Sequence, residues 1–138
     1  MRLVLDTNVV VAAMRSPAGG SAELLRRIRA GRFRMLTSVP LFLEYEAVAM
    51  RPGHLEAAQA SPADVRNLLD VLALLAEPVE IHYLWRPQRP DPADDMVLEA
   101  AVNGRAEAIV TFNHADFKAV PRAFGIAVVD PAAVLRRG

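Results

Sequence analysis

The chain opens with a short apolar run that ends in a carboxylate. Residues 3–5 are Leu-Val-Leu, Asp6 follows directly, and a second apolar run occupies residues 9–13 after Thr7 and Asn8. A short, continuously apolar run is typical of a strand buried on both faces in a parallel sheet. An Asp at the carboxyl end of such a strand lies at the edge where open α/β sheets bind their ligands. The opening therefore predicts a parallel sheet with Asp6 in a binding position.

Length and composition limit the class of protein. The 138 residues, 53% of them apolar and 6% aromatic, fit one domain spanning residues 1–138 with an aliphatic core. The sequence has no cysteine, which excludes a disulfide framework and a thiolate metal site. No apolar run reaches the ~18 residues that cross a bilayer, and the start does not look like a signal peptide. We therefore expect a cytoplasmic protein that does not enter a membrane.

Strand and helix signals alternate along the whole chain. Strands are predicted at residues 3–5, 33–37, 79–82, 108–111 and 126–129. Helices are predicted at residues 9–15, 21–30, 39–50, 62–76 and 92–103 and after Asp130, with a loop at 84–92 and a short helical turn at 113–117. Residues 51–60 are the least periodic part of the chain, and Pro52-Gly53 predicts a turn there. This order predicts an α/β fold in which helical layers cover both faces of a parallel sheet of four to five strands.

Acidic residues follow the strands at similar positions. Asp6 ends the first strand, Glu44 lies on the helix after the second, Asp94 and Asp95 open the helix after the third, and Asp116 follows the fourth. In a parallel sheet these positions share one edge, so we expect their carboxylates to converge. Like charges that converge need raised pKa values or a cation, and oxygen ligands favour Mg²⁺ or Mn²⁺. The pattern predicts a metal-dependent site for phosphodiester hydrolysis.

Each acid also has an ordinary structural explanation. Asp94 and Asp95 can simply stabilise a helix N-terminus, and Asp116 can be a solvated turn residue. Glu46 competes with Glu44, since two positions apart on a helix they point in nearly opposite directions. The argument for a site is the shared position of the acids, not any one of them.

Polar neighbours of the strand ends can support such a site. Asn8 can orient Asp6 or a bound water, although Thr7 and Asn8 can equally belong to a helix start. Thr111 and Asn113 stand in the same position after the fourth strand.

A proline-rich loop carries two candidates for substrate binding. Trp85 can stack on a base and Arg86 can hold a phosphate, while a tryptophan covering a core edge or a dimer contact is the ordinary alternative.

Arginines are concentrated in one short segment. Fifteen of the sixteen basic residues are arginine, and five of them lie close together: Arg26, Arg27, Arg29, Arg32 and Arg34. The guanidinium group suits phosphate oxygens, so a phosphate-contacting surface is one explanation. A GC-rich genome, which favours arginine codons, is the other. The net charge of zero favours neither.

Taken together, the motifs resemble those of the PIN-domain family, and more narrowly the toxin component of bacterial toxin–antitoxin systems. The resemblance covers nearly the whole chain in the right order. The motifs that carry it are residues 3–8 (Leu-Val-Leu-Asp-Thr-Asn), Ser38 with Glu44, residues 91–95 (Asp-Pro-Ala-Asp-Asp) with Leu98 and residues 100–101, and residues 110–117.

The resemblance implies a fold, an activity and partners. The fold is an α/β/α sandwich on a parallel sheet, and the activity is Mg²⁺- or Mn²⁺-dependent cleavage of RNA. It further implies a homodimer and a cognate antitoxin that occupies the acidic pocket.

Matched by position, the acids that the resemblance implies as metal ligands and catalytic residues are Asp6, Glu44, Asp95 and Asp116. Asn113 departs from the pattern, because relatives often carry an Asp there, and this leaves a second metal position in doubt.

Two functions follow from these observations. The first is a metal-dependent endoribonuclease, the toxin of a toxin–antitoxin pair. The alternative is a catalytically weak or inactive PIN-like module that binds RNA or a partner protein. A phosphatase with Asp6 as nucleophile would need a second Asp at position 8, where this chain has Asn8.

Overall fold

A parallel sheet lies at the centre of the fold. Within residues 1–83 and 92–138, which the computed structural model describes, five strands pair in the order β3-β2-β1-β4-β5. The central strand β1 (Arg2–Leu5) pairs with β2 (Arg34–Thr37) on one side and β4 (Ala108–Val110) on the other, while β3 (Glu77–Pro78) and β5 (Ala127–Val129) form the edges. Because every pairing is parallel, the carboxyl ends of the strands share one edge of the sheet.

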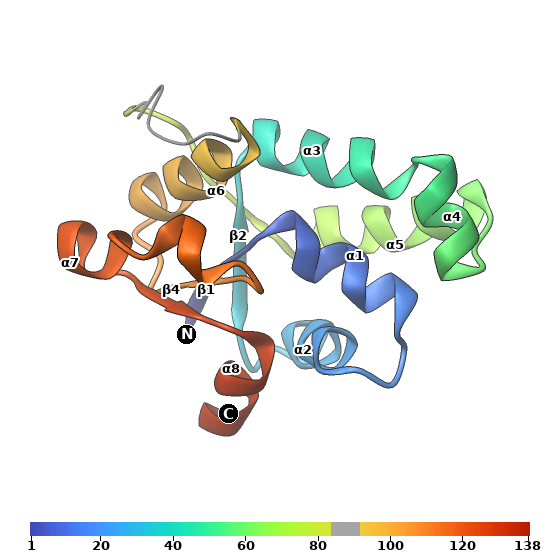
Figure 1. Cartoon of the computed structure of the whole chain (residues 1–138), viewed down its shortest axis with the longest axis horizontal. Coiled ribbons are helices and arrows are strands. Elements are labelled where there is room, and N and C mark those ends of the chain that lie inside the picture. The colour runs from blue at the N-terminus through green and yellow to red at the C-terminus, as the bar shows by residue number, and fades with distance from the viewer. Residues whose placement is uncertain (84–91) are drawn as a thin grey trace.

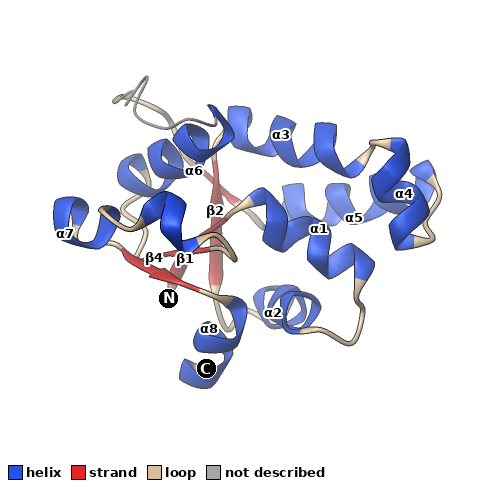
Figure 2. Cartoon of the chain, viewed as in Figure 1, coloured by secondary structure: helices blue, strands red, loops and turns tan. Residues whose placement is uncertain are grey.

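Helices surround this sheet (Figure 1), and Figure 2 shows the strands enclosed among them. The helix α6 packs on β1, β2 and β4, α3 packs against α1 and α6, and α2 packs against α8. None of the helices in the two described segments is long and apolar enough to cross a membrane. The arrangement confirms the predicted α/β fold. The helices are α1 (Thr7–Arg15), α2 (Gly20–Arg29), α3 (Val39–Ala49), α4 (Pro52–Ala58), α5 (Pro62–Leu75), α6 (Pro92–Asn103), α7 (Val120–Phe124) and α8 (Pro131–Arg137), with a 3₁₀ turn, η1 (His114–Phe117).

The helix boundaries follow their capping residues. Ser38 accepts from the backbone N–H of Leu41, and Ser61 forms a reciprocal capping box with Asp64. Asp130 accepts from the backbone N–H of Ala133 at the start of α8.

The predicted third strand, residues 79–82, is wrong in position. The strand β3 is Glu77–Pro78, and only one further ladder bond, from the Val79 N–H to the Thr37 carbonyl (2.9 Å), extends it. Beyond it the strand does not continue, because the N–H groups of His82 and Tyr83 both donate to Asn103 Oδ1 (2.9 and 3.0 Å). A side chain distant in sequence takes the donors that a longer strand needs.

The turn predicted at Pro52-Gly53 is instead the start of a helix. The short helix α4 begins at Pro52 and ends with Gln59 in the left-handed region (φ 52°). Its buried residue, His54, accepts a hydrogen bond at Nδ1 from Arg15 Nε of α1 (3.0 Å). Tertiary contact with α1 therefore supports a helix that the sequence periodicity does not indicate.

Gly104 follows α6 at a point of close approach. A Cβ atom there would lie 2.8 Å from the carbonyl oxygen of Ala100 and 2.8 Å from Val79 Cγ2. Gly53 in α4, by contrast, has open space around the equivalent position.

We predict that Gly104→Ala destabilises the protein by about 1–3 kcal/mol, because backbone must move to admit the methyl group. Gly53→Ala is the matched control and should be neutral or stabilising by up to about 1 kcal/mol, since alanine favours a helix. Urea unfolding midpoints measure both. Equal effects from the two substitutions would contradict the packing at Gly104.

Candidate functional site

The carboxylate of Asp6 joins three elements at the carboxyl edge of the sheet. Asp6 is 5% exposed, and its Oδ1 accepts from the backbone N–H of Thr7 (2.8 Å) at the start of α1. Its Oδ2 accepts from the Thr111 hydroxyl (2.7 Å), which follows β4, and its own N–H donates to the Val110 carbonyl (2.9 Å). Two donors therefore hold this carboxylate in one orientation.

Thr111 connects Asp6 to the segment after β4. Its side chain is buried, donates to Asp6, and accepts from the backbone N–H of Asn113 (2.9 Å). The structure thus brings the supporting residue Thr111 to Asp6, whereas the side chain of Asn113 is exposed.

Tyr45 is fully buried and close enough to Asp6 to interact with its charge. Its hydroxyl donates to the carbonyl of Leu5, the residue before Asp6. Burial, together with the negative charge of Asp6, raises the pKa of the Tyr45 hydroxyl far above its usual value, although hydrogen bonding to Thr37 opposes the rise. Tyr45 therefore stays a neutral donor at any physiological pH.

The structure separates the two glutamates of α3. Glu46 is bound to Arg66 of α5 (2.9 Å), so its carboxylate is engaged on the side of the helix that faces α5. Glu44 is half-buried on the turn that carries Tyr45. Of the two candidates, only Glu46 forms a salt bridge to α5, and Glu44 does not.

The first two turns of α6 contribute buried acids. Asp94 and Asp95 are 7% and 4% exposed, and Glu99, one turn after Asp95, is 2% exposed. Glu99 is absent from our sequence-based candidates. Its spacing of four residues from Asp95 on a predicted helix was the signal that could have identified it.

The remaining predicted site residues are Asp116, Trp85 and Arg86. Asp116 is exposed in η1, where its N–H donates to the Asn113 carbonyl (3.2 Å). Trp85 and Arg86 lie outside the described residues. The structure thus brings Asp6 and Thr111 together, buries Asp94 and Asp95, and leaves Asp116 at the surface.

The donor chemistry of this edge fits a hard cation. Thr7 and Asn8 directly follow Asp6. Their buried side-chain oxygens, Oγ1 and Oδ1, have no hydrogen-bond partner among the described residues. Carboxylate, hydroxyl and amide oxygens are ligands that Mg²⁺ and Mn²⁺ accept. Across residues 1–83 and 92–138, however, no three His, Asp or Glu side chains are grouped closely enough to hold an ion together. Water would therefore have to complete the coordination of an ion bound here.

The histidines belong to other parts of the structure. Burial, and the adjacent Arg15 guanidinium, lower the pKa of His54, which keeps it a neutral acceptor between α1 and α4. His82 lies 3.6 Å from Glu80, and His114 is exposed in η1.

The class of protein follows from these observations: an α/β fold with a buried acid at the carboxyl edge of a parallel sheet and further buried acids in α6. A family model described as PIN domain matches residues 2–115, so the chain belongs to the PIN-domain family. PIN domains are generally nucleases that use divalent metals, which supports hydrolysis of phosphodiester bonds. Asp116 lies just beyond the matched residues. No curated protein matches the sequence.

We predict that Thr111→Val lowers the free energy of unfolding by about 1–3 kcal/mol, because Asp6 loses a donor and the Asn113 N–H loses an acceptor in a buried place. The substitution keeps the size and shape of the side chain, so the loss reports the hydroxyl. Thr111→Ser, which keeps the hydroxyl, is the control and should retain more stability. Urea unfolding of both variants measures this, and a Thr111→Val protein as stable as the parent would contradict the assigned contacts.

Proposed function

We propose that this protein is a metal-dependent endoribonuclease and the toxin of a toxin–antitoxin pair, acting in the cytoplasm. The observations that support the proposal are the buried Asp6, each of whose carboxylate oxygens accepts a hydrogen bond, and the buried acids of α6. Membership of a family of nucleases supports phosphodiester hydrolysis. RNA as substrate and the toxin role come from the narrower sequence resemblance.

The acids of this edge would hold Mg²⁺ or Mn²⁺, directly or through water. A bound ion supplies two effects, activation of a water for attack on phosphorus and neutralisation of charge on the phosphate. The ligands we propose are Asp6, Glu44, Asp95 and Asp116, with Asn8, Asp94, Thr111 and Asn113 in supporting roles.

The chain's own residues prepare this chemistry. The Thr7 N–H and Thr111 hydroxyl orient Asp6, so it needs no reorganisation to act as a ligand. Tyr45, kept neutral, fixes the strand end without adding charge. The start of α6 stabilises the negative charge of Asp94 and Asp95 through the helix dipole.

A module that binds RNA or a protein without cutting is the second candidate. Two observations favour it: Asn113 is neutral, and Asp116 is exposed rather than buried with the other acids. Both reduce the negative charge available for a second ion.

The first experiment measures cleavage of a panel of single-stranded RNAs and tRNA with Mn²⁺, Mg²⁺ or EDTA. We predict metal-dependent cleavage that Asp6→Asn and Glu44→Gln each reduce by at least about 100-fold, because even outer partners of metal ligands are worth about 10- to 100-fold. The fold of Asp6→Asn should persist, since the substitution relieves charge repulsion.

Glu46→Gln is the matched control on α3 and should cleave like the parent, since Glu46 is paired with Arg66. Expression of the parent, but not of Asp6→Asn, should arrest growth if the protein is a toxin, and a co-expressed antitoxin should restore it. Undiminished cleavage by Asp6→Asn would refute the site. No cleavage by folded protein with any metal would favour the binding module.

We also propose that the protein forms a homodimer through α3. The side chains of Val39 and Leu43 are 72% and 54% exposed, and they line a mainly apolar hollow of about 230 Å³ that continues to Phe42 and Pro78. Exposed apolar surface of this kind is typical of a protein contact. A second copy presents the same apolar strip and can cover it symmetrically.

Light scattering tests the dimer. We expect a dimeric mass for the parent and a monomeric mass for Leu43→Glu, because a charge would be buried in the contact. Leu74→Glu, at an exposed leucine that does not line this hollow, is the control and should stay dimeric. A monomeric parent at concentrations of tens of micromolar would refute the proposal.

A further inference from the structure

The amino edge of the sheet, opposite to Asp6, carries a group of exposed arginines. The chain leaves α2 at Arg29 and enters β2 at Arg34, whose N–H donates to the Met1 carbonyl (2.9 Å). The end of α8 reaches the same place, because Gly138 packs against the ring of Phe33. We call the exposed arginines of these segments the arginine face: Arg29, Arg32, Arg34, Arg136 and Arg137.

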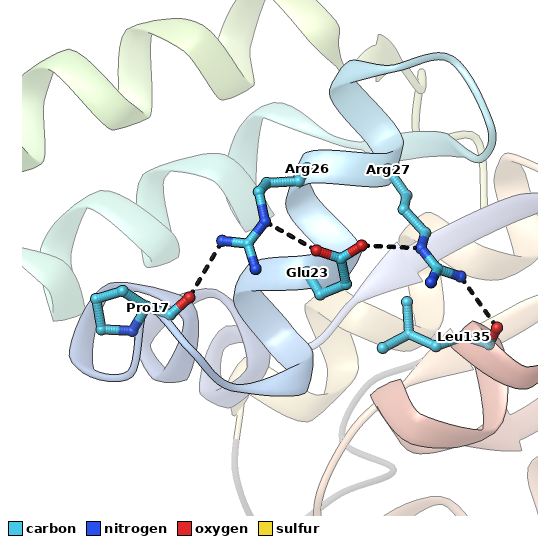
Figure 3. A network of polar contacts seen from close by, with 5 residues as sticks. All are labelled: Pro17, Glu23, Arg26, Arg27 and Leu135. Atoms are coloured by element: carbon cyan, nitrogen blue, oxygen red, sulfur yellow. Dashed lines mark hydrogen bonds and ion pairs between the residues drawn. The ribbon is translucent and has the colours of Figure 1, made fainter.

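Two other arginines hold α2 and α8 together (Figure 3). Glu23 binds Arg26 (2.8 Å) and Arg27 (3.1 Å), and these two arginines lower the pKa of its carboxyl. Arg27 also donates to the Leu135 carbonyl of α8, and Arg26 to the Pro17 carbonyl in the loop before α2 (both 3.1 Å). The two helices therefore lie side by side (Figure 1), which brings together the arginines at their ends.

The end of α2 fixes the backbone of Arg32. Gly31 adopts a left-handed conformation (φ 82°), and its N–H donates to the Ile28 carbonyl (3.0 Å). The N–H of Arg32 donates to the Arg27 carbonyl (2.9 Å), which completes a Schellman motif. The position of Arg32 is thus set by backbone hydrogen bonds, while its side chain is exposed.

Arg32 and Arg34 line a hollow of about 520 Å³ between the end of α2 and the end of α5. Glu77 also lines it, and both Arg2 (2.8 Å) and Arg34 (3.1 Å) bind this carboxylate and lower its pKa. One negative charge is thus shared by two guanidinium groups. The side chain of Arg32 forms no ion pair or hydrogen bond within residues 1–83 and 92–138, so positive charge is in excess around the hollow.

Helix dipoles account for only part of this charge. Arginines in the last turn of a helix stabilise its C-terminus, which carries roughly half a negative elementary charge. The ends of α2 and α8 therefore offset about one unit of charge. The members of the arginine face other than Arg34 form no side-chain ion pair or hydrogen bond in the described part of the chain. Positive charge remains after the dipoles are satisfied, and it attracts an anionic ligand.

The arrangement of the arginine face suits the phosphates of a nucleic-acid strand. Its guanidinium groups are spread over two helix ends and a loop, so they match an anion with repeated charges better than a single small ion. The planar guanidinium group binds phosphate oxygens through two parallel hydrogen bonds. In the proposed nuclease the acidic edge repels phosphates, so attraction for RNA has to come from another part of the surface.

We infer that the arginine face is a second contact site for RNA, which holds backbone phosphates at the amino edge of the sheet while the strand is cut at the carboxyl edge. The inference rests on the proposed RNA-cleaving function. Arg2 and Asp6, at the two ends of β1, lie about 13 Å apart at about 3.3 Å per residue. A stacked strand advances about 3.4 Å per nucleotide, so it needs at least about four nucleotides to reach both edges.

The test is binding of labelled oligouridylates of about four and about twenty nucleotides to the full chain in EDTA, measured by fluorescence anisotropy over a range of salt concentrations. We expect the longer RNA to bind more tightly and with a steeper dependence on salt. Each phosphate contact of a single strand contributes about 0.7 to the slope of log Kd against log salt concentration. Arg32→Gln and Arg136→Gln should each lower this slope by about 0.7 and weaken binding of the longer RNA.

Arg51→Gln is the matched control. Arg51 is also exposed, but it lies at the start of α4, which Figure 1 shows far from α8. The control should bind RNA like the parent. An equal loss in all three variants, or a loss in none, would overturn the inference. Binding of poly-glutamate through Arg32 and Arg136 by a protein that binds no RNA would also overturn it, and would assign the face to an acidic protein segment.

Cleavage assays distinguish this inference from the proposed function. In a protein that cuts RNA, Arg32→Gln should raise KM for the longer RNA with little change in kcat, and should leave cleavage of the shorter RNA unchanged. Cleavage of both lengths that is insensitive to the arginine face would overturn the inference while the nuclease stands. Binding of the longer RNA through the arginine face, by a protein that cuts no RNA with any metal, would refute the proposed nuclease but support the RNA contact.

Discussion

The structure depends on a buried carboxylate at the end of its central strand. Asp6 ends β1, caps α1 through the Thr7 N–H, and binds the hydroxyl that follows β4. An ionised carboxylate away from water is tolerated only where donors surround it. The same contacts that permit its burial therefore fix where β1, α1 and β4 meet. The position of Asp6 therefore follows from how β1, α1 and β4 pack together, and this acid belongs to the interior of the fold.

The other acids show how the fold accommodates further negative charge. Asp94 and Asp95 lie in the first turn of α6, where the helix dipole favours them, and Tyr45 beside Asp6 is a neutral donor. On α3, the charge of Glu46 is offset by its ion pair with Arg66. Each of these contacts stabilises or offsets a negative charge locally.

The sequence predicts those parts of the fold whose causes are local. The apolar run at β1, the Ser61 capping box and the acid after the first strand all act over a few residues, and the structure has them where the patterns place them. The position of β3 could not be predicted, because Asn103, some twenty residues away, takes the N–H groups that would extend it. The helix α4 escaped prediction for the same reason, since its buried residue is held by Arg15 of another helix.

The candidate site follows the same division. Asp6 and its contact with Thr111 follow from strand ends that are adjacent in a parallel sheet, and spacing alone indicates them. Glu99 could be identified only once the buried face of α6 was known. The different contacts of Glu44 and Glu46 depend on where α5 packs. Trp85 and Arg86 stay predictions from sequence.

The net charge of zero gives no hint of an anionic ligand, and the structure explains why this number is uninformative. Two of the clustered arginines are engaged by Glu23 and by carbonyl groups, so they organise α2 instead of offering free charge. The other arginines of that segment, and those at the end of α8, lie at the amino edge of the sheet, whereas Asp6 lies at the carboxyl edge. Positive and negative groups therefore cancel in the total although they occupy opposite edges of the sheet. In the proposed nuclease, the acidic edge would repel a phosphate backbone, so a cation is needed there. The contacts of Arg26 and Arg27 hold α2 in position against α8 and the loop before it.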